Sequence, residues 1–207
     1  CSVGIDMIAG PSEILLVSDN QNKPEHIAVD LLSQAEHDPE AQSILITNDK
    51  NFAKKVEHAI DQQLLQLPRR QIASASWKNW GAIILVKDFE QAPDLINKIA
   101  PEHLELAIEN PSDLAEKINH AGAIFLGRYT PEAIGDYIAG PNHVLPTSRA
   151  ARFSSGLSVF DFLKRTSLIE CTQSGLNAIG PAASLLAECE CLDAHALSIT
   201  QRLNALD

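Results

Sequence analysis

Short apolar runs alternate with amphipathic stretches over most of the chain, and this alternation limits the fold more than any other feature. The apolar runs have the length and the Ile, Leu and Val content of buried strands, at residues 13–17, 43–47, 81–86, 101–106 and 122–126. Stretches with helical spacing lie between them, at residues 24–37, 51–67, 88–100 and 113–120. Strands that alternate with helices through short connections predict an α/β domain with a mostly parallel sheet. Ligands of such sheets bind beyond the carboxyl ends of the strands, so we expect the functional site there.

The pattern changes character after residue 157. The remaining residues contain an apolar segment at 158–164, a candidate strand at 167–171 and candidate helices at 174–191 and 193–204. Gly180 and Pro181 are expected to kink the first of these helices. We therefore predict an incomplete Rossmann-like α/β domain over residues 1–157 and a small, mainly helical C-terminal segment over residues 158–207. No Gly-x-Gly-x-x-Gly dinucleotide-binding fingerprint is present in the sequence.

Composition narrows the choice of partners. The net charge of −11 argues against a nucleic acid or an anionic membrane surface and suits a cationic or metal-bearing ligand. No apolar run approaches the roughly 20 residues of a membrane span, and we expect no signal peptide. Cys1, Cys171, Cys189 and Cys191 do not follow zinc-ribbon spacing, so we interpret them as free thiols in a reducing, cytoplasmic compartment. Because the chain begins at Cys1 and an apolar segment follows at once, we expect that a longer chain has lost its front part.

An irregular segment at residues 135–147 combines a carboxylate, Asp136, with a Gly-Pro break and an imidazole, His143. Long irregular segments inside compact domains are often functional loops. The alternative is an ordinary packed connection in which Asp136 caps a turn and His143 is structural. This segment alone does not decide between them.

Gln34 and His37 are three residues apart in a predicted helix, which places them on one face. Two such side chains can reach the same cation, although an amide oxygen is a poorer zinc ligand than imidazole. The alternative is a polar helix end, where His37 interacts favourably with the helix dipole.

Glu102 and His103 follow Pro101 at a predicted junction between helix and strand. A histidine beside a carboxylate can act as a general base near neutral pH. Neighbours on a strand point to opposite faces, so both residues can equally be structural. Glu190 and His195 are close in sequence at a later helix junction, where a solvated face is the simpler interpretation.

Together these segments resemble the histidinol dehydrogenase family over the whole chain. The matching motifs are Ile5-Asp6-x-x-Ala9-Gly10-Pro11-Ser12-Glu13, Asp30-Leu31-Leu32-Ser33-Gln34-Ala35-Glu36-His37, Pro101-Glu102-His103-Leu104-Glu105, Gly135-Asp136-Tyr137, Gly140-Pro141-Asn142-His143-Val144-Leu145-Pro146-Thr147 and Gly156-Leu157-Ser158-Val159-Phe160. The resemblance is to the later part of a longer family member. It implies oxidation of L-histidinol to L-histidine through an aldehyde, with two NAD molecules, in histidine biosynthesis.

The resemblance also implies roles for particular residues. One zinc ion per subunit would be held by Gln34, His37 and Asp136, with His195 from the other subunit of a homodimer. These four residues would line the substrate pocket together with Ser12, His103, His143 and Glu190. His103 would be the general base and Glu102 would activate water. The C-terminal segment would then serve dimerisation and complete the active site.

In the family, the N-terminal part that has no counterpart in this sequence supplies the contacts to the nicotinamide cofactor. No NAD site is therefore expected in this chain. We therefore expect the isolated chain to be inactive. Three interpretations stay open: a fragment or subunit that is active only with its front part, a non-catalytic module that binds zinc and imidazole ligands, and a remnant that does not fold stably. The retained candidate residues favour the first two.

Overall fold

The computed structural model describes residues 4–203. Contacts within the chain separate two compact units, of which the first ends at Phe162 and the second begins at Leu163. The division therefore falls at Phe162, slightly beyond the boundary at residue 157 that the sequence suggested. Cys1, one of the predicted free thiols, lies outside the described residues, whereas Cys171, Cys189 and Cys191 are free and exposed.

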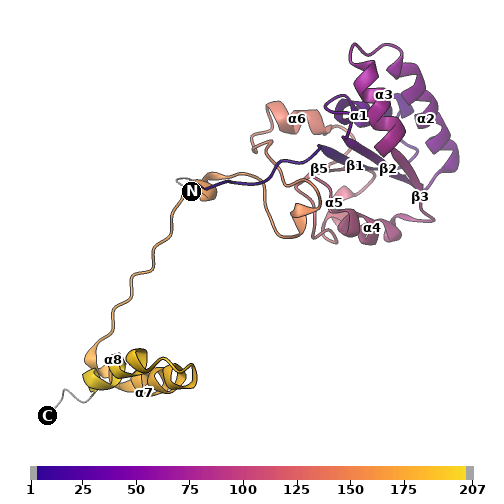
Figure 1. Cartoon of the computed structure of the whole chain (residues 1–207). Helices are drawn as coiled ribbons and strands as arrows, with labels where there is room; N and C mark the ends of the chain where they lie inside the picture. Colours follow the sequence, from indigo (N-terminus) through magenta and orange to yellow (C-terminus); the bar gives the residue numbers. More distant parts are fainter. Residues whose placement is uncertain (1–3, 204–207) are drawn as a thin grey trace. The chain divides into compact units, whose positions relative to one another are not determined.

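The first unit is built on a parallel sheet with the strand order β3-β2-β1-β4-β5 (Figure 1). Its strands are β1 (Glu13–Ser18), β2 (Gln42–Thr47), β3 (Ala82–Leu85), β4 (His103–Ala107) and β5 (Ala123–Leu126). Every neighbouring pair runs parallel. The order reverses between β1 and β4, which are hydrogen-bonded neighbours although two strands separate them in the sequence. The predicted α/β class with a parallel sheet is confirmed.

Helices cover both faces of this sheet. They are α1 (Pro24–Ala35), α2 (Lys50–Leu64), α3 (Arg70–Trp80), α4 (Ala92–Ile99), α5 (Pro111–Ala115) and α6 (Glu132–Tyr137), with short 3₁₀ turns η1 (Phe89–Gln91), η2 (Ala150–Arg152) and η3 (Val159–Phe162). Ile14 and Leu16 of β1 pack with α1, α2 and α3, whereas Leu15 and Val17 pack with α4 and α5. Figure 1 shows these two sets of helices on opposite sides of the strands. Because successive strand residues point to opposite faces, one apolar strand serves two cores.

Helix α3 was not predicted from the sequence. It buries only Ala73 and Ser76, and its other side chains are largely polar. Such a narrow apolar stripe gives little periodic signal. Ser76 is buried because its hydroxyl donates to the Ala41 carbonyl oxygen at 2.8 Å. This helix therefore depends on tertiary contacts more than on its own pattern.

The second unit consists of α7 (Gln173–Cys189) and α8 (Asp193–Leu203), which pack against each other. Gly180 of α7 allows this packing, because a Cβ atom there would lie 3.1 Å from the Leu203 side chain. The predicted strand at residues 167–171 is wrong: this segment has no regular secondary structure, and Leu168 and Ile169 are more than nine-tenths exposed. A β-prone sequence forms no strand where the described chain offers it no partner strand. Within the described residues, no helix is long and apolar enough to cross a membrane.

Candidate functional site

The candidate residues of the first unit gather at the amino ends of the strands, not at the carboxyl ends where we expected them. His103 opens β4, and it lies opposite Ile14, the second residue of β1. His37 follows α1, and Asp136 lies in the last turn of α6. A crossover helix runs back against the direction of its strand, so its C-terminal end reaches the amino edge of the sheet. The expectation of a site at the carboxyl edge is therefore wrong for these residues.

His103 is almost fully buried, and its ring is held in one orientation. Its Nδ1 atom lies 3.0 Å from the backbone carbonyl oxygen of Glu13. A carbonyl oxygen only accepts, so Nδ1 carries the hydrogen and Nε2 of the neutral ring keeps a free lone pair. Burial lowers the pKa of His103, and this outweighs the Glu13 carbonyl and Asp136, which raise it. A neutral imidazole with a free lone pair at Nε2 is ready to accept a proton.

Glu102 lies beside this ring as a second buried acid–base group. Its Oε2 atom accepts a hydrogen bond from the Glu13 backbone N–H at 2.9 Å and lies 3.6 Å from His103 Nδ1. Burial, together with the nearby carboxylates of Glu13 and Asp136, raises the pKa of Glu102 to about 8. An ionised carboxyl group with such a pKa is a much stronger base than an ordinary glutamate.

The side chain of Glu13 joins three segments at this edge. Its carboxylate accepts the backbone N–H of Ser148 at 2.8 Å and that of Glu102 at 3.3 Å. Nearby, the Gly10 N–H donates to Thr147 Oγ1 at 2.7 Å, and a Cβ atom at Gly10 would overlap the Ser148 hydroxyl. The loop that contains His143 is thus tied to the segment that contains Ser12. His143 itself is exposed and Ser12 is half-buried, so their roles as substrate contacts stay predictions.

Three further carboxyl groups lie between α1, β4 and α6, two of them buried and that of Asp30 half-buried. Asp30 comes from α1, Glu105 from β4 and Glu132 from α6, and the last two are only 3% exposed. Glu105 lies close enough to Asp30 and Glu132 for the charges of both to act on its carboxyl group. Burial is the largest cause that raises the pKa of each, and their mutual repulsion adds to it for Glu105 and Glu132.

This carboxyl cluster had no assigned role in the sequence analysis, where Asp30 and Glu105 appeared only inside motifs. One signal was available: Glu105 is a charged residue in a buried strand, two residues from His103 and therefore on the same face. Glu132 gave no such signal, because an acid in the first turn of a helix is normally explained by the helix dipole.

Several buried atoms at the same edge suit a cation. Gln34 is 1% exposed, and its Oε1 atom has no hydrogen-bond partner within the described part of the chain. The same holds for His103 Nε2 and Glu132 Oε1, which are 3.6 Å apart. His103, Glu132 and Asp136 each offer an atom within 4.8 Å of the others. Because unpaired buried polar atoms are costly, a bound ion that satisfied some of them would stabilise the fold.

The structure thus brings Glu102, His103 and Asp136 together, with Asp136 Oδ1 4.0 Å from His103 Nε2. His37 is exposed and lies close enough to His103 to contribute to its lowered pKa. Whether Gln34, His37 and Asp136 share one zinc ion stays a prediction. Glu190 directly follows α7 and His195 lies in α8. Both are exposed, and their part in the site also stays a prediction.

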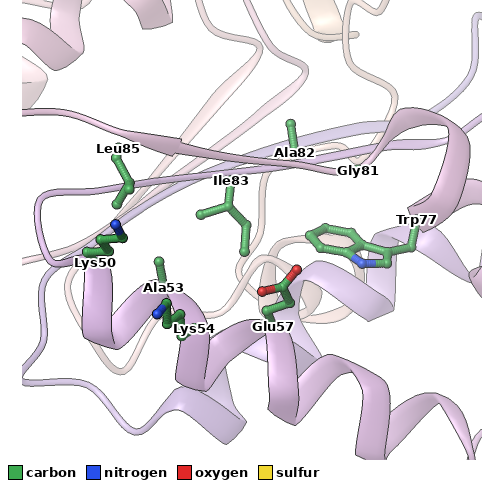
Figure 2. Close-up of a pocket in the computed structure, with 9 residues that line it drawn as sticks. All are labelled: Lys50, Ala53, Lys54, Glu57, Trp77, Gly81, Ala82, Ile83 and Leu85. Carbon is green, nitrogen blue, oxygen red and sulfur yellow. The ribbon is translucent and has the colours of Figure 1, made fainter.

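A separate pocket of about 410 Å³ lies beside the edge strand β3 (Figure 2). Trp77 of α3 forms one wall, and Lys50, Lys54 and Glu57 of α2 lie along another. None of the candidate site residues lines it. Its mixed charges and the absence of a histidine or cysteine among its lining residues give it no evident reaction chemistry.

The chain is similar to known proteins over almost its whole length. A family model described as histidinol dehydrogenase matches residues 1–203. Histidinol dehydrogenase of Rhodospirillum rubrum is 65% identical over 204 residues, and histidinol dehydrogenase 1 of Trichormus variabilis is 61% identical over 206 residues. The alignments cover 98% and 100% of this chain but only 47% and 48% of those proteins.

A solved structure agrees with the sequence relatives. The crystal structure of histidinol dehydrogenase from Elizabethkingia anophelis matches with a TM-score of 0.90 and 43% identity, over 99% of this chain and 47% of that one. The chain therefore spans about half the length of the relatives it matches. Because the family model and the relatives cover nearly all of its residues, the chain belongs to the histidinol dehydrogenase family.

Proposed function

We propose that this chain supplies the acid–base and metal-binding part of a histidinol dehydrogenase, an enzyme that oxidises L-histidinol to L-histidine through histidinaldehyde. The observation that supports this most is the buried His103 ring, whose Nδ1 is held by the Glu13 carbonyl and whose Nε2 is left free beside Asp136. We assign the contacts to NAD to the part of the relatives that this chain does not cover. NAD supplies the hydride acceptor in both oxidations.

His103 serves the first oxidation. Its Nε2 lone pair takes the hydroxyl proton of histidinol while the hydrogen on the same carbon departs as hydride, and the C–O bond becomes the aldehyde double bond. The lowered pKa of His103 favours the neutral ring that this step requires. The hydrogen bond from Nδ1 to the Glu13 carbonyl keeps the ring oriented and stabilises the imidazolium that forms.

Glu102 serves the second oxidation. An aldehyde must be hydrated before it can lose another hydride, so a water molecule has to give up a proton as its oxygen bonds to the aldehyde carbon. The raised pKa of Glu102, about 8, makes its carboxylate a suitable acceptor for that proton. Because Glu102 has taken the proton of the water, the hydrate forms as its anion, and loss of hydride from that anion leaves the carboxylic acid of histidine.

Gln34, His37 and Asp136 would hold a zinc ion, with His195 contributed by the second subunit of a homodimer. When bound, the ion supplies an anchor for the imidazole and amino groups of the substrate. The unpaired Gln34 Oε1 supports this donor set, since an amide oxygen buried without a partner is available to a cation. Ser12, His143 and Glu190 complete the substrate pocket. The acidic chain suits a cationic amine.

The test combines binding with complementation. Zinc and histidinol are titrated into the purified chain, and NADH formation is then assayed with and without the remaining part of a relative added in trans. We expect binding by the chain alone, no turnover alone and turnover after complementation. Binding without turnover in the complemented mixture would favour the non-catalytic zinc and imidazole-binding fragment. A chain that neither melts cooperatively nor binds zinc would contradict both.

A further inference from the structure

The crevice at the carboxyl ends of β1 and β4 is filled by the chain's own side chains. The strand order reverses between these two strands, and doubly wound sheets bind their ligands at such a point. Here Asp19 follows β1, Ala107 ends β4, and Arg128 follows β5. These residues close the position that a ligand occupies in other sheets of this class.

Arg128 makes a paired contact across this crevice. Its Nη1 donates to Asp19 Oδ1 at 2.6 Å, and its Nη2 donates to Asp19 Oδ2 at 2.7 Å. Nη1 also reaches the Ala107 carbonyl oxygen at 3.2 Å, which accepts from Asn22 Nδ2 as well. Both charged side chains are partly buried, with 26% of Arg128 and 17% of Asp19 exposed. A planar guanidinium that grips a carboxylate with two hydrogen bonds fixes both position and direction.

The few residues after Arg128 connect this contact rigidly to helix α6. Gly127 adopts a φ of +92°, which favours glycine, and its N–H donates to the Leu106 carbonyl oxygen at 3.0 Å. Thr130 Oγ1 donates to the Leu126 carbonyl oxygen at 2.8 Å, so this hydroxyl secures the turn and does not cap α6. Pro131 then leads directly into Glu132, the first residue of α6.

Helix α6 needs such support because it has only six residues. A helix this short is not stable on its own and takes its position from its contacts. Apart from the Arg128 connection, Gly135 packs so closely on the Phe125 ring that a Cβ atom would lie 2.6 Å from it. The helix carries Asp136, which we assigned to the metal, and Glu132, which faces His103.

We propose that Arg128 is a positioning residue, whose paired contact with Asp19 at the carboxyl edge of the sheet holds α6, and with it Asp136, in place at the amino edge. This inference rests on the proposed metal role of Asp136. The inference depends on this long-range contact. Asp19 and Arg128 are 109 residues apart in sequence, and their contact fixes the connection from which α6 starts.

The test compares zinc affinity in the whole chain, measured by competition with a chelator, for Arg128→Met, Asp19→Asn and the double variant. Lys117→Met is the matched control, since it removes the exposed Lys117–Glu90 ion pair of 2.7 Å elsewhere on the same unit. We expect at least a tenfold loss of zinc affinity in each variant of the pair, no larger loss in the double variant, and no change in the control. Arg128→Lys keeps the charge without the paired geometry, and we expect it to restore only part of the affinity.

Amide exchange supplies a readout that does not depend on metal. The Ile138 N–H donates to the Ile134 carbonyl oxygen at the end of α6, and we expect its hydrogen exchange to quicken in the Arg128 variants while that of β1 stays unchanged. Unchanged zinc affinity and unchanged Ile138 exchange in a folded Arg128→Met chain would overturn the inference. If the unaltered chain binds no zinc, the proposed function fails, and the exchange data still decide the role of Arg128. If Arg128→Met does not fold, the same measurements on Asp19→Asn and Arg128→Lys decide.

Discussion

The two edges of the sheet differ in how completely their polar atoms are satisfied. At the amino edge, Gln34 Oε1, His103 Nε2 and Glu132 Oε1 are buried without a hydrogen-bond partner in the described chain. At the carboxyl edge, the Asp19 carboxylate accepts from Arg128, from Gln21 and from Glu109. Unpaired buried groups are costly to folding and persist where something else binds them, whereas a closed network already has its partners. The difference indicates chemistry at one edge and structural support at the other.

The largest effect is expected at the amino edge from His103→Asn. Loss of a general base typically reduces turnover by about 10²–10⁴-fold, so NADH formation by the complemented enzyme should fall by that range. His58→Asn changes an exposed histidine of α2 and should leave the rate unchanged. Similar rates for the two variants would remove the distinction between the edges.

Zinc uptake gives the next test of the amino edge. We expect His37→Ala to abolish stoichiometric zinc binding, because the imidazole is the strongest neutral donor that this chain contributes to the proposed set. Metal content after dialysis measures it, with His58→Ala as the matched control. Full uptake by His37→Ala would contradict the ligand assignment and leave the alternative donors His103, Glu132 and Asp136.

The buried carboxyl groups predict a pH dependence of stability for the metal-free chain. The folded-state pKa of Glu102 is about 8 and that of Glu105 is also raised, both mainly by burial, whereas unfolded glutamates titrate near 4.3. Between these values the folded state binds more protons than the unfolded state. The free energy of unfolding should therefore fall as pH rises from about 5 to 8.

Urea unfolding in the presence of a chelator measures this dependence at the two pH values. Glu105→Gln should flatten it, because a neutral amide replaces the buried acid without a change of shape. Glu116→Gln, an exposed glutamate, should not. A metal-free chain that is equally stable at both pH values would show that these groups are not held protonated by the fold.

The smallest effect is expected at the carboxyl edge, from Asp49→Ala. Asp49 caps α2 by accepting the Asn51 and Phe52 N–H groups at 2.7 and 2.9 Å. Its loss should lower the melting temperature by a few degrees and leave zinc affinity unchanged. A clear loss of zinc affinity would mean that the carboxyl edge influences the site more broadly than through Arg128. Asp61→Ala, an exposed position on the same helix, is the control.

Local patterns predicted the parts of this molecule that depend on neighbours in sequence. Strong apolar runs located the strands closely, as with the predicted strand at 122–126 and the observed β5 at Ala123–Leu126. Helix α3 was not predicted and the strand at 167–171 was predicted wrongly, for the same reason. The helix depends on what packs against it, and the strand fails because it has no partner strand. A local sequence pattern contains neither kind of information.

The candidate site shows the same limit. Motifs identified Glu102, His103 and Asp136, and the fold brings these three together. The motifs gave no role to Glu13, although one of them ends with it, and did not include Glu132, because a glutamate that starts a strand or a helix has ordinary local explanations. Their importance comes from atoms of distant residues, such as the Ser148 N–H that Glu13 accepts.

The sequence by itself determined the family, the alternation of strands and helices, and the acids and imidazoles available for chemistry, since all of these are properties of residues and their spacing. Only the tertiary structure decided which edge of the sheet carries them, which nitrogen of His103 is free, and which carboxyl groups are buried together. The physical reason is that proton affinity, desolvation and hydrogen bonding depend on distances of a few ångströms between residues tens to more than a hundred positions apart.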